Sequence, residues 1–113
     1  MELTVQQNRA GNGTLVLTLA GGITAGRCET LEKQVVSLIE SGEKRVVLDV
    51  TSITFLDSAG IGTLVACFSK LKKAGGDMRL AGAAGKVESV LKMTQVDKVV
   101  RFFPTVETAA ADF

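Results

Sequence analysis

The sequence predicts an α/β fold in which a mixed sheet of four to five strands packs against about four helices, in the order β-β-α-β-α-β-α-β-α. Two observations support this prediction. Short segments rich in β-branched residues alternate with segments whose apolar residues recur at the helical spacing. A nearly continuous apolar segment near the middle of the chain is typical of a strand buried on both faces of a parallel sheet.

The N-terminal third predicts a β-hairpin followed by a helix. Residues 3–7 and 14–21 are short β-like segments, and the connector at residues 8–13 has the Asn-Gly chemistry of a turn. Between residues 27 and 40 the apolar side chains follow one helical face, and Gly42 is placed to end that helix. The apolar positions are Cys28, Leu31, Val35, Leu38 and Ile39.

The rest of the chain predicts strands that alternate with helices. Residues 45–53 are the buried strand, and residues 77–82 and 99–103 are two further strands. Pro104 is placed to open a C-terminal helix. The helices between the strands carry apolar stripes at Ile61, Leu64, Val65, Phe68 and Leu71, and at Val87, Val90 and Leu91. Because crossovers are right-handed, the later strands are expected to be parallel.

Composition excludes several functions. The 113 residues carry a net charge of +1 and no basic stripe, so nucleic-acid binding has little support. No apolar segment approaches the roughly 20 residues of a membrane-spanning helix, and no secretory signal is visible. With no histidine, a Ser-His-Asp triad and histidine-based zinc sites are excluded. Cys28 and Cys67 are expected to be free, buried thiols of a cytoplasmic protein, and residues 1–113 one domain.

The segment TFLDSAGIGTLV, residues 54–65, concentrates the polar candidates where the buried strand gives way to a helix. A nucleophile elbow would need glycine two residues before Ser58, where Leu56 stands. Asp57 or Ser58 is a favourable N-cap, but Gly60 and Gly62 each cost about 0.5–1 kcal/mol inside a helix. The residues therefore leave two alternatives open. The junction is either only a helix N-cap or a site where another group approaches the backbone closely at the two glycines.

Nucleotide binding finds only weak support. The segment AGAAGK at residues 81–86 lacks the spacing of a P-loop, and Val87 occupies the Ser/Thr place. The pair Gly60 and Gly62 lacks the third glycine of a dinucleotide fingerprint. Residues 81–86 are better interpreted as a loop between a strand and a helix.

Residues 49–82 resemble the core of STAS domains, and specifically the stand-alone anti-sigma factor antagonists. The family signature is an Asp-Ser-(Ser/Ala)-Gly-(Leu/Ile)-Gly run after a buried strand, and the chain matches it with Asp57, Ser58, Ala59, Gly60, Ile61 and Gly62. The order of elements also agrees, so the resemblance implies a STAS-like domain along nearly the whole chain.

The resemblance implies a protein-binding switch, with no catalytic residue, metal or cofactor of its own. The unphosphorylated form would bind an anti-sigma factor and release its sigma factor. That anti-sigma factor, a serine kinase with its own ATP and Mg²⁺, would phosphorylate Ser58, and a serine phosphatase would reset the system. The implied partner-binding residues are Thr24, Asp57, Ser58, Ala59, Gly60, Ile61, Gly62 and Thr63. The two glycines would leave the helix start bare for the partner.

The chain departs from the family pattern at Thr24. Many members have an acid at the end of a Gly-Glu-(Leu/Ile)-Asp run, whereas residues 21–24 here read GGIT. Residues 23–26, ITAG, fit an Ile-Thr-x-Gly run found in similar proteins. Thr24 is also a candidate N-cap for the helix at residues 27–40.

Two other functions remain as alternatives. The chain could be an unphosphorylated STAS subunit of a lipid-transport or other transporter complex, or a small-molecule binder with an anion site at Gly60 to Gly62. Lys70, Lys72 and Lys73 are expected on the solvated side and in the C-terminal turn of their helix, and Asp49 is expected to hydrogen-bond nearby loop backbone. The sequence leaves open whether the domain forms a weak dimer.

Overall fold

The computed structural model describes residues 2–113 and contains one five-stranded mixed sheet. The strands lie in the order β1-β2-β3-β4-β5, with β1 antiparallel to β2 and every later neighbouring pair parallel. Their bounds are β1 Leu3–Arg9, β2 Leu15–Ile23, β3 Arg45–Leu56, β4 Asp77–Ala81 and β5 Arg101–Phe103. The predicted hairpin and parallel strands are confirmed.

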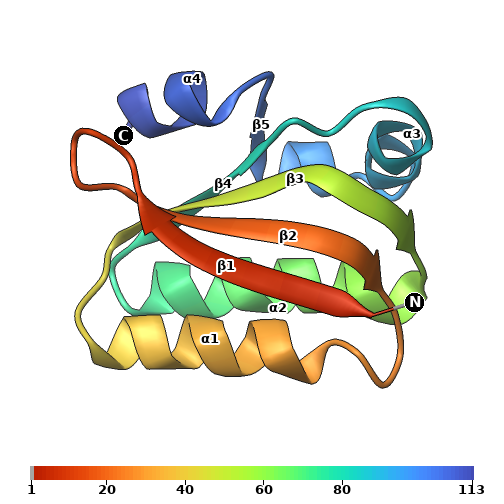
Figure 1. Ribbon diagram of the computed structural model, residues 1–113, viewed down its shortest axis with the longest axis horizontal. Coiled ribbons are helices and arrows are strands. Elements are labelled where there is room, and N and C mark those ends of the chain that lie inside the picture. Colours follow the sequence, from red (N-terminus) through yellow and green to blue (C-terminus); the bar gives the residue numbers. More distant parts are fainter. Residues whose placement is uncertain (1) are drawn as a thin grey trace.

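Within the described residues, four helices flank the sheet. They are α1 Glu29–Glu40, α2 Ser58–Lys73, α3 Gly85–Met93 and α4 Val106–Ala111, and a single 3-10 turn covers Val96–Lys98. Figure 1 shows α1 and α2 side by side under one face of the sheet, whereas α4 lies over the opposite face near the β1–β2 loop. The element order is therefore the predicted β-β-α-β-α-β-α-β-α.

Glycines end the two longest helices, as the sequence predicts for Gly42. Gly42 has a φ of +85°, and its amide donates to the carbonyl of Ile39 at 3.0 Å. Gly75, with a φ of +88°, follows α2 in the same way. The lysines of the last turn of α2 lie on its exposed side, as predicted: Lys70, Lys72 and Lys73.

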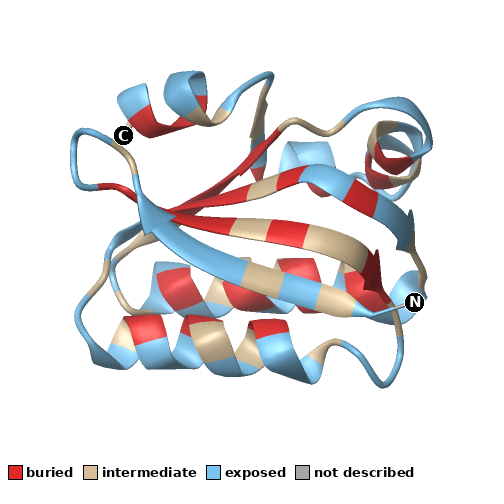
Figure 2. Ribbon diagram, viewed as in Figure 1, coloured by how far each residue is buried: buried red, intermediate tan, exposed pale blue. Residues whose placement is uncertain are grey.

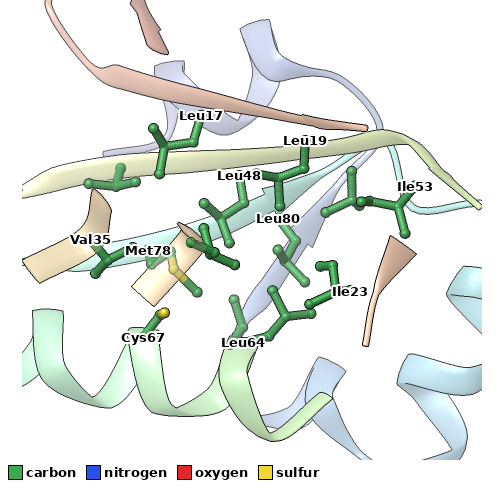
Figure 3. Close-up of a cluster of buried hydrophobic side chains, with 14 of the residues drawn as sticks. Leu17, Leu19, Ile23, Val35, Leu48, Ile53, Leu64, Cys67, Met78 and Leu80 are labelled. Carbon is green, nitrogen blue, oxygen red and sulfur yellow. The ribbon is translucent and has the colours of Figure 1, made fainter. Parts of the chain in front are cut away.

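The main core fills the space between the sheet and α1, α2 and α3. It is built from alternate residues of the strands, such as Leu17 and Leu48, and from the buried stripes of the helices, such as Leu64. Figure 3 shows these side chains together with Cys67 and Met78. Cys67 is buried and Cys28 half-buried, and both are free cysteines.

Several boundaries differ from the prediction. The strands β1, β2 and β3 each end two or three residues later than predicted, and three other boundaries have a clear local cause. The first helix begins at Glu29 rather than at residue 27, because the preceding residues form a turn. The last strand is confined to Arg101–Phe103, since a 3-10 turn uses the residues before it. Pro104 precedes the final helix, and Thr105 is its N-cap through a capping box with Thr108.

Candidate functional site

The junction singled out by the sequence lies where β3 ends and α2 begins. Asp57 has an extended backbone, and Ser58 is the first helical residue. The Gly60 amide donates to Asp57 Oδ1 at 2.8 Å, and the Ile61 amide donates to the Asp57 carbonyl at 3.0 Å. Of the two residues that were candidates for the cap, Asp57 is therefore the N-cap of α2.

The second carboxylate oxygen of Asp57 joins α2 to the turn between β2 and α1. The Ala25 amide donates to Asp57 Oδ2 at 2.9 Å, and the Asp57 amide donates to the Ile23 carbonyl at 3.3 Å. The hydrogen bond from Ala25, followed by that from Gly60, lowers the pKa of Asp57 below its ordinary value. The carboxylate is therefore ionised at neutral pH, and it holds two backbone segments together.

Gly60 is buried and permits a close approach between α2 and the end of β2. A Cβ atom on Gly60 would lie 2.0 Å from the carbonyl oxygen of Ile23 and 2.8 Å from its carbonyl carbon. Backbone atoms cannot swing away as the end of a flexible side chain can, so contacts within the chain already require glycine here. The expectation that Gly60 is left bare for a partner is wrong.

The exposed part of the helix start consists of Ser58, Ala59 and Gly62, which we call the Ser58 surface. A Cβ atom on Gly62 would have no atom within 4 Å, so the space beside Gly62 is open. Ile61 is half-buried and packs against the main core. The Ser58 surface can therefore be approached by another molecule without any movement of the chain.

Thr63, which the resemblance assigns to partner binding, is buried. Its hydroxyl lies 3.0 Å from the Ala59 carbonyl oxygen and 3.3 Å from Glu32 Oε1 on α1, and it can donate to either. The side chain of Thr63 therefore links α2 to α1 and is not part of the surface, so the expectation for this residue is wrong.

Thr24 lies in the turn between β2 and α1 and does not cap α1. Its carbonyl accepts a hydrogen bond from the Arg27 amide at 2.8 Å and another from the Cys28 thiol at 3.2 Å. The residue at the N-cap position is Cys28, whose side chain makes no capping hydrogen bond. The predicted cap is wrong, but Thr24 remains beside Ala25, whose amide binds Asp57.

Sequence reasoning missed two residues of this region, Ala25 and Phe55. Ala25 contributes only its backbone amide, and the sequence does not show where a backbone amide points. Phe55 is 50% exposed. Simple alternation along β3 would place Phe55 on the same face as the buried Ile53. A register shift opposite Gly21 and Gly22 inserts an extra residue into β3 and turns Phe55 outward.

The other motifs behave as structural elements. Gly82 has a φ of +80°, and a Cβ atom there would lie 2.0 Å from Thr51 Oγ1, so this glycine serves the packed loop that the sequence predicts for residues 81–86. Within residues 2–113 no cluster of three Cys, Asp or Glu side chains could hold a metal ion. Nor does any helix in that range have the length and apolar character needed to cross a membrane.

Comparison with known proteins points to one family. A model of the STAS domain matches residues 5–109. The chain is 26% identical over 102 residues to BtrV of Bordetella bronchiseptica, a candidate anti-sigma factor antagonist by name, covering 90% of this chain and 88% of that protein.

Two solved structures are similar in fold. One is an anti-sigma factor antagonist from Mycobacterium paratuberculosis, with a TM-score of 0.86 and 24% identity over 98% of this chain and 93% of that one. The other is the Bacillus cell fate determinant SpoIIAA in its phosphorylated form, with a TM-score of 0.73 and 18% identity over 96% and 98% of the two chains.

Proposed function

The chain belongs to the STAS domain family, and we propose that it is an anti-sigma factor antagonist that binds an anti-sigma factor through the Ser58 surface. The observation that carries this proposal is the exposed Ser58 at the first position of α2, beside a fixed carboxylate. The name of the Bordetella relative supports the same activity. A cytoplasmic location follows from the proposal.

Phosphorylation of Ser58 would switch the binding off. A phosphoryl group adds a charge of about −1.5 to −2. At Ser58 it would stand beside the ionised Asp57, on the surface where the partner docks. We propose that the anti-sigma factor is itself the kinase, with its own ATP and Mg²⁺, and that a serine phosphatase removes the group. The existence of a phosphorylated form of SpoIIAA, which shares the fold, supports the proposal that this chain is phosphorylated.

The proposed switch acts by repulsion rather than by refolding. The contacts that hold the start of α2 are the two hydrogen bonds to the Asp57 carboxylate and the close approach of Gly60 to Ile23. None of these contacts uses the Ser58 hydroxyl, and the positive end of the helix dipole favours an anion at this position. The phosphorylated chain is therefore expected to keep its fold while losing its partner.

Thr24 affects the choice of partner rather than the position of Ser58. The acid that many family members carry at this position is replaced by a half-buried threonine, so the turn carries one negative charge fewer near Ser58. We expect the cognate kinase to recognise Asp57 and the exposed backbone at Gly62 without an acid from this turn.

A pull-down from a lysate of the source organism tests the proposal. The baits are the wild-type chain, Ser58→Asp, and Ser37→Asp, which places the same charge on an exposed position of α1. Bound proteins are identified by mass spectrometry. A captured anti-sigma factor is then incubated with wild-type chain and ATP, and the phosphorylated residue is mapped.

The three baits separate the alternatives. An anti-sigma factor held by wild type and Ser37→Asp but lost by Ser58→Asp supports the switch. Equal retention of one set of partners by all three baits contradicts it. Retention of transporter subunits by all three would instead favour the transporter alternative, in which Ser58 is never phosphorylated.

A further inference from the structure

One face of the sheet is covered along only part of its length. Residues that are directly opposite in the strand register share a face, so β1, β2 and β3 form rows across the sheet. Three successive rows on the α4 side are Asn8–Val16–Val47, Gln6–Thr18–Asp49 and Thr4–Ala20–Ser52. The helix α4 packs on Val16 and Val47 of the first row, in a small cluster with its own Ala109 and Ala110.

The second and third rows, which we call the open rows, are partly or fully exposed. Figure 2 shows β1 largely exposed and β2 alternating between buried and half-buried residues. Parallel strands are normally covered on both faces, and β2 and β3 are a parallel pair. Apart from Asp49, the open rows carry small or uncharged side chains rather than the lysines and glutamates of a solvated face. Another chain can therefore approach this part of the sheet closely.

A groove of about 320 Å³ opens between the β1–β2 loop and α4 at the edge of the open rows. Its lining includes Asp49 and Glu107, and among residues 2–113 no lysine or arginine lies within 4 Å of either carboxylate. Arg9 also lines the groove, but Glu43 balances its charge at 2.6 Å. The groove thus carries two uncompensated negative charges.

Asp49 is held in a fixed orientation inside this groove. Its Oδ1 atom accepts hydrogen bonds from the Thr51 hydroxyl at 2.6 Å and from the Thr51 amide at 3.1 Å. The predicted hydrogen bond to nearby backbone is thus present, but its donor is Thr51 within β3 rather than a loop residue. Its Oδ2 atom receives no hydrogen bond from residues 2–113. One carboxylate oxygen is therefore positioned for a donor from outside the chain.

We propose that the open rows and this groove bind a basic segment of a partner protein, with one lysine or arginine side chain between Asp49 and Glu107. The negative groove selects a cationic side chain and disfavours nucleic acid or an anionic membrane. The uncharged open rows allow the flanking residues of the segment to lie against the sheet. Asp49 precedes the end of β3 by seven residues, so the site lies roughly 20 Å from the Ser58 surface. It is a second docking site that does not use Ser58.

The experiment uses two synthetic probes and the isotope-labelled full chain. Acetylated and amidated Ser-Arg-Gly-Arg-Ser and Ser-Glu-Gly-Glu-Ser are titrated separately into the chain, and amide chemical shifts are followed by NMR. The arginine peptide is expected to cause saturable shifts centred on Thr18, Asp49 and Glu107 that weaken as salt is added. The glutamate peptide is expected to cause none.

Variants locate the contact. The double substitution Asp49→Asn and Glu107→Gln is expected to raise the apparent Kd of the arginine peptide at least fivefold, and the introduced asparagine side chain retains an oxygen for the Thr51 bonds. Glu40→Gln, which removes an exposed acid of α1, is the matched control and is expected to leave the Kd unchanged. Thr18→Arg, which places a guanidinium in the row of Asp49, is expected to abolish the shifts while circular dichroism stays native.

Three outcomes would overturn the proposal. The first is a set of shifts spread equally over the exposed acids of α1, and the second is an affinity that survives the double substitution. The third is the absence of saturable shifts at millimolar peptide. None of these outcomes depends on Ser58, so the proposed binding of an anti-sigma factor is tested separately by the pull-down.

Discussion

The two faces of the sheet are held by different means. On the side of α1 and α2, the larger cluster contains twenty buried residues, almost all of them large and apolar. On the side of α4, the second cluster contains five, of which three are alanines. The helix α4 thus packs on a much smaller apolar cluster than α1 and α2, and burial stabilises roughly in proportion to area.

Polar contacts also hold α4 and the residues that follow it against the sheet. Arg79 is only 7% exposed, and its guanidinium lies 4.0 Å from the centre of the Phe113 ring and 3.3 Å from Asp112. Arg101 binds the same Asp112 oxygen at 2.6 Å. On the other side of α4, Asn12 donates to the Ala110 carbonyl at 2.9 Å.

This difference bears on the proposed switch. The Ser58 surface is at one end of α2, which belongs to the well-packed side. A charge added there meets a helix whose position is already determined by close backbone contacts and a large core. The following predictions test how far the two sides are independent, beginning with the largest expected effect.

Gly60→Ala is expected to cause the largest loss of stability, about 3 kcal/mol, because the new methyl group would overlap the Ile23 carbonyl. Gly62→Ala, two residues further along α2 in open space, is expected to raise the free energy of unfolding by up to about 1 kcal/mol through helix propensity. Urea unfolding of both variants measures the difference. Equal stability of the two variants would show that α2 is free to move away from β2.

Arg79→Met is expected to lower the free energy of unfolding by about 2 kcal/mol, because Asp112 and the Phe113 ring lose the buried cation between them. Amide hydrogen exchange should accelerate in α4 while the amides of α2 keep their protection. Arg101→Met, at a far more exposed position, should cost less than about 0.5 kcal/mol. If α2 exchanged as fast as α4 in Arg79→Met, the two sides would form one cooperative unit.

The two sides also differ in what the sequence could predict. The large core follows from periodicity: the buried strand at residues 45–53 and the stripe through Leu64 and Leu71 appear where expected. The helix α4 is six residues long, and its attachment depends on Arg79 and Asp112, which lie far apart in the sequence and show no local pattern.

The junction between β3 and α2 also has features that the sequence predicts and features that it does not. Asp57 is recognisable as a cap because capping is local chemistry. Its bond to Ala25 and the contact of Gly60 with Ile23 depend on where another segment of backbone passes. Residue type alone therefore identifies the junction but cannot separate its buried members, Gly60 and Thr63, from its exposed ones.

Asp57→Asn is expected to give a moderate loss that depends on pH. An Asn side chain can still cap Gly60, but its amide group would face the Ala25 amide, where two donors meet. At pH 7 we expect a Tm lower by about 4–8 °C, the size of effect that one such contact has in a domain of this length.

The sign of the pH dependence follows from the lowered pKa of Asp57. Because the folded pKa lies below the unfolded one, the contribution of this carboxylate is complete above about pH 4 and is lost as the pH falls through the folded value. The Tm gap between wild type and Asp57→Asn should therefore narrow as the pH is lowered from 5 to 3. A gap that stays constant would show that the charge of Asp57 does not stabilise the junction.

The smallest effect concerns the two thiols of the well-packed side and involves no loss of stability. Burial, followed by the negative charge of Glu32, raises the pKa of Cys67 to about 11, and the residue is 1% exposed. At pH 8 only about 0.1% of this thiol would be ionised even if it were accessible. Cys28 is half-buried at the start of α1.

A disulfide reagent should therefore modify Cys28 at least tenfold faster than Cys67, and Cys28→Ser should remove the fast phase of the reaction. Because Cys67 is buried between α2 and the sheet, we expect it to react only when α2 moves away from the sheet. Its slow phase should therefore accelerate in Gly60→Ala and remain unchanged in Arg79→Met. Acceleration in Arg79→Met would mean that loosening α4 also opens the core beneath α2, and the two sides would not be independent.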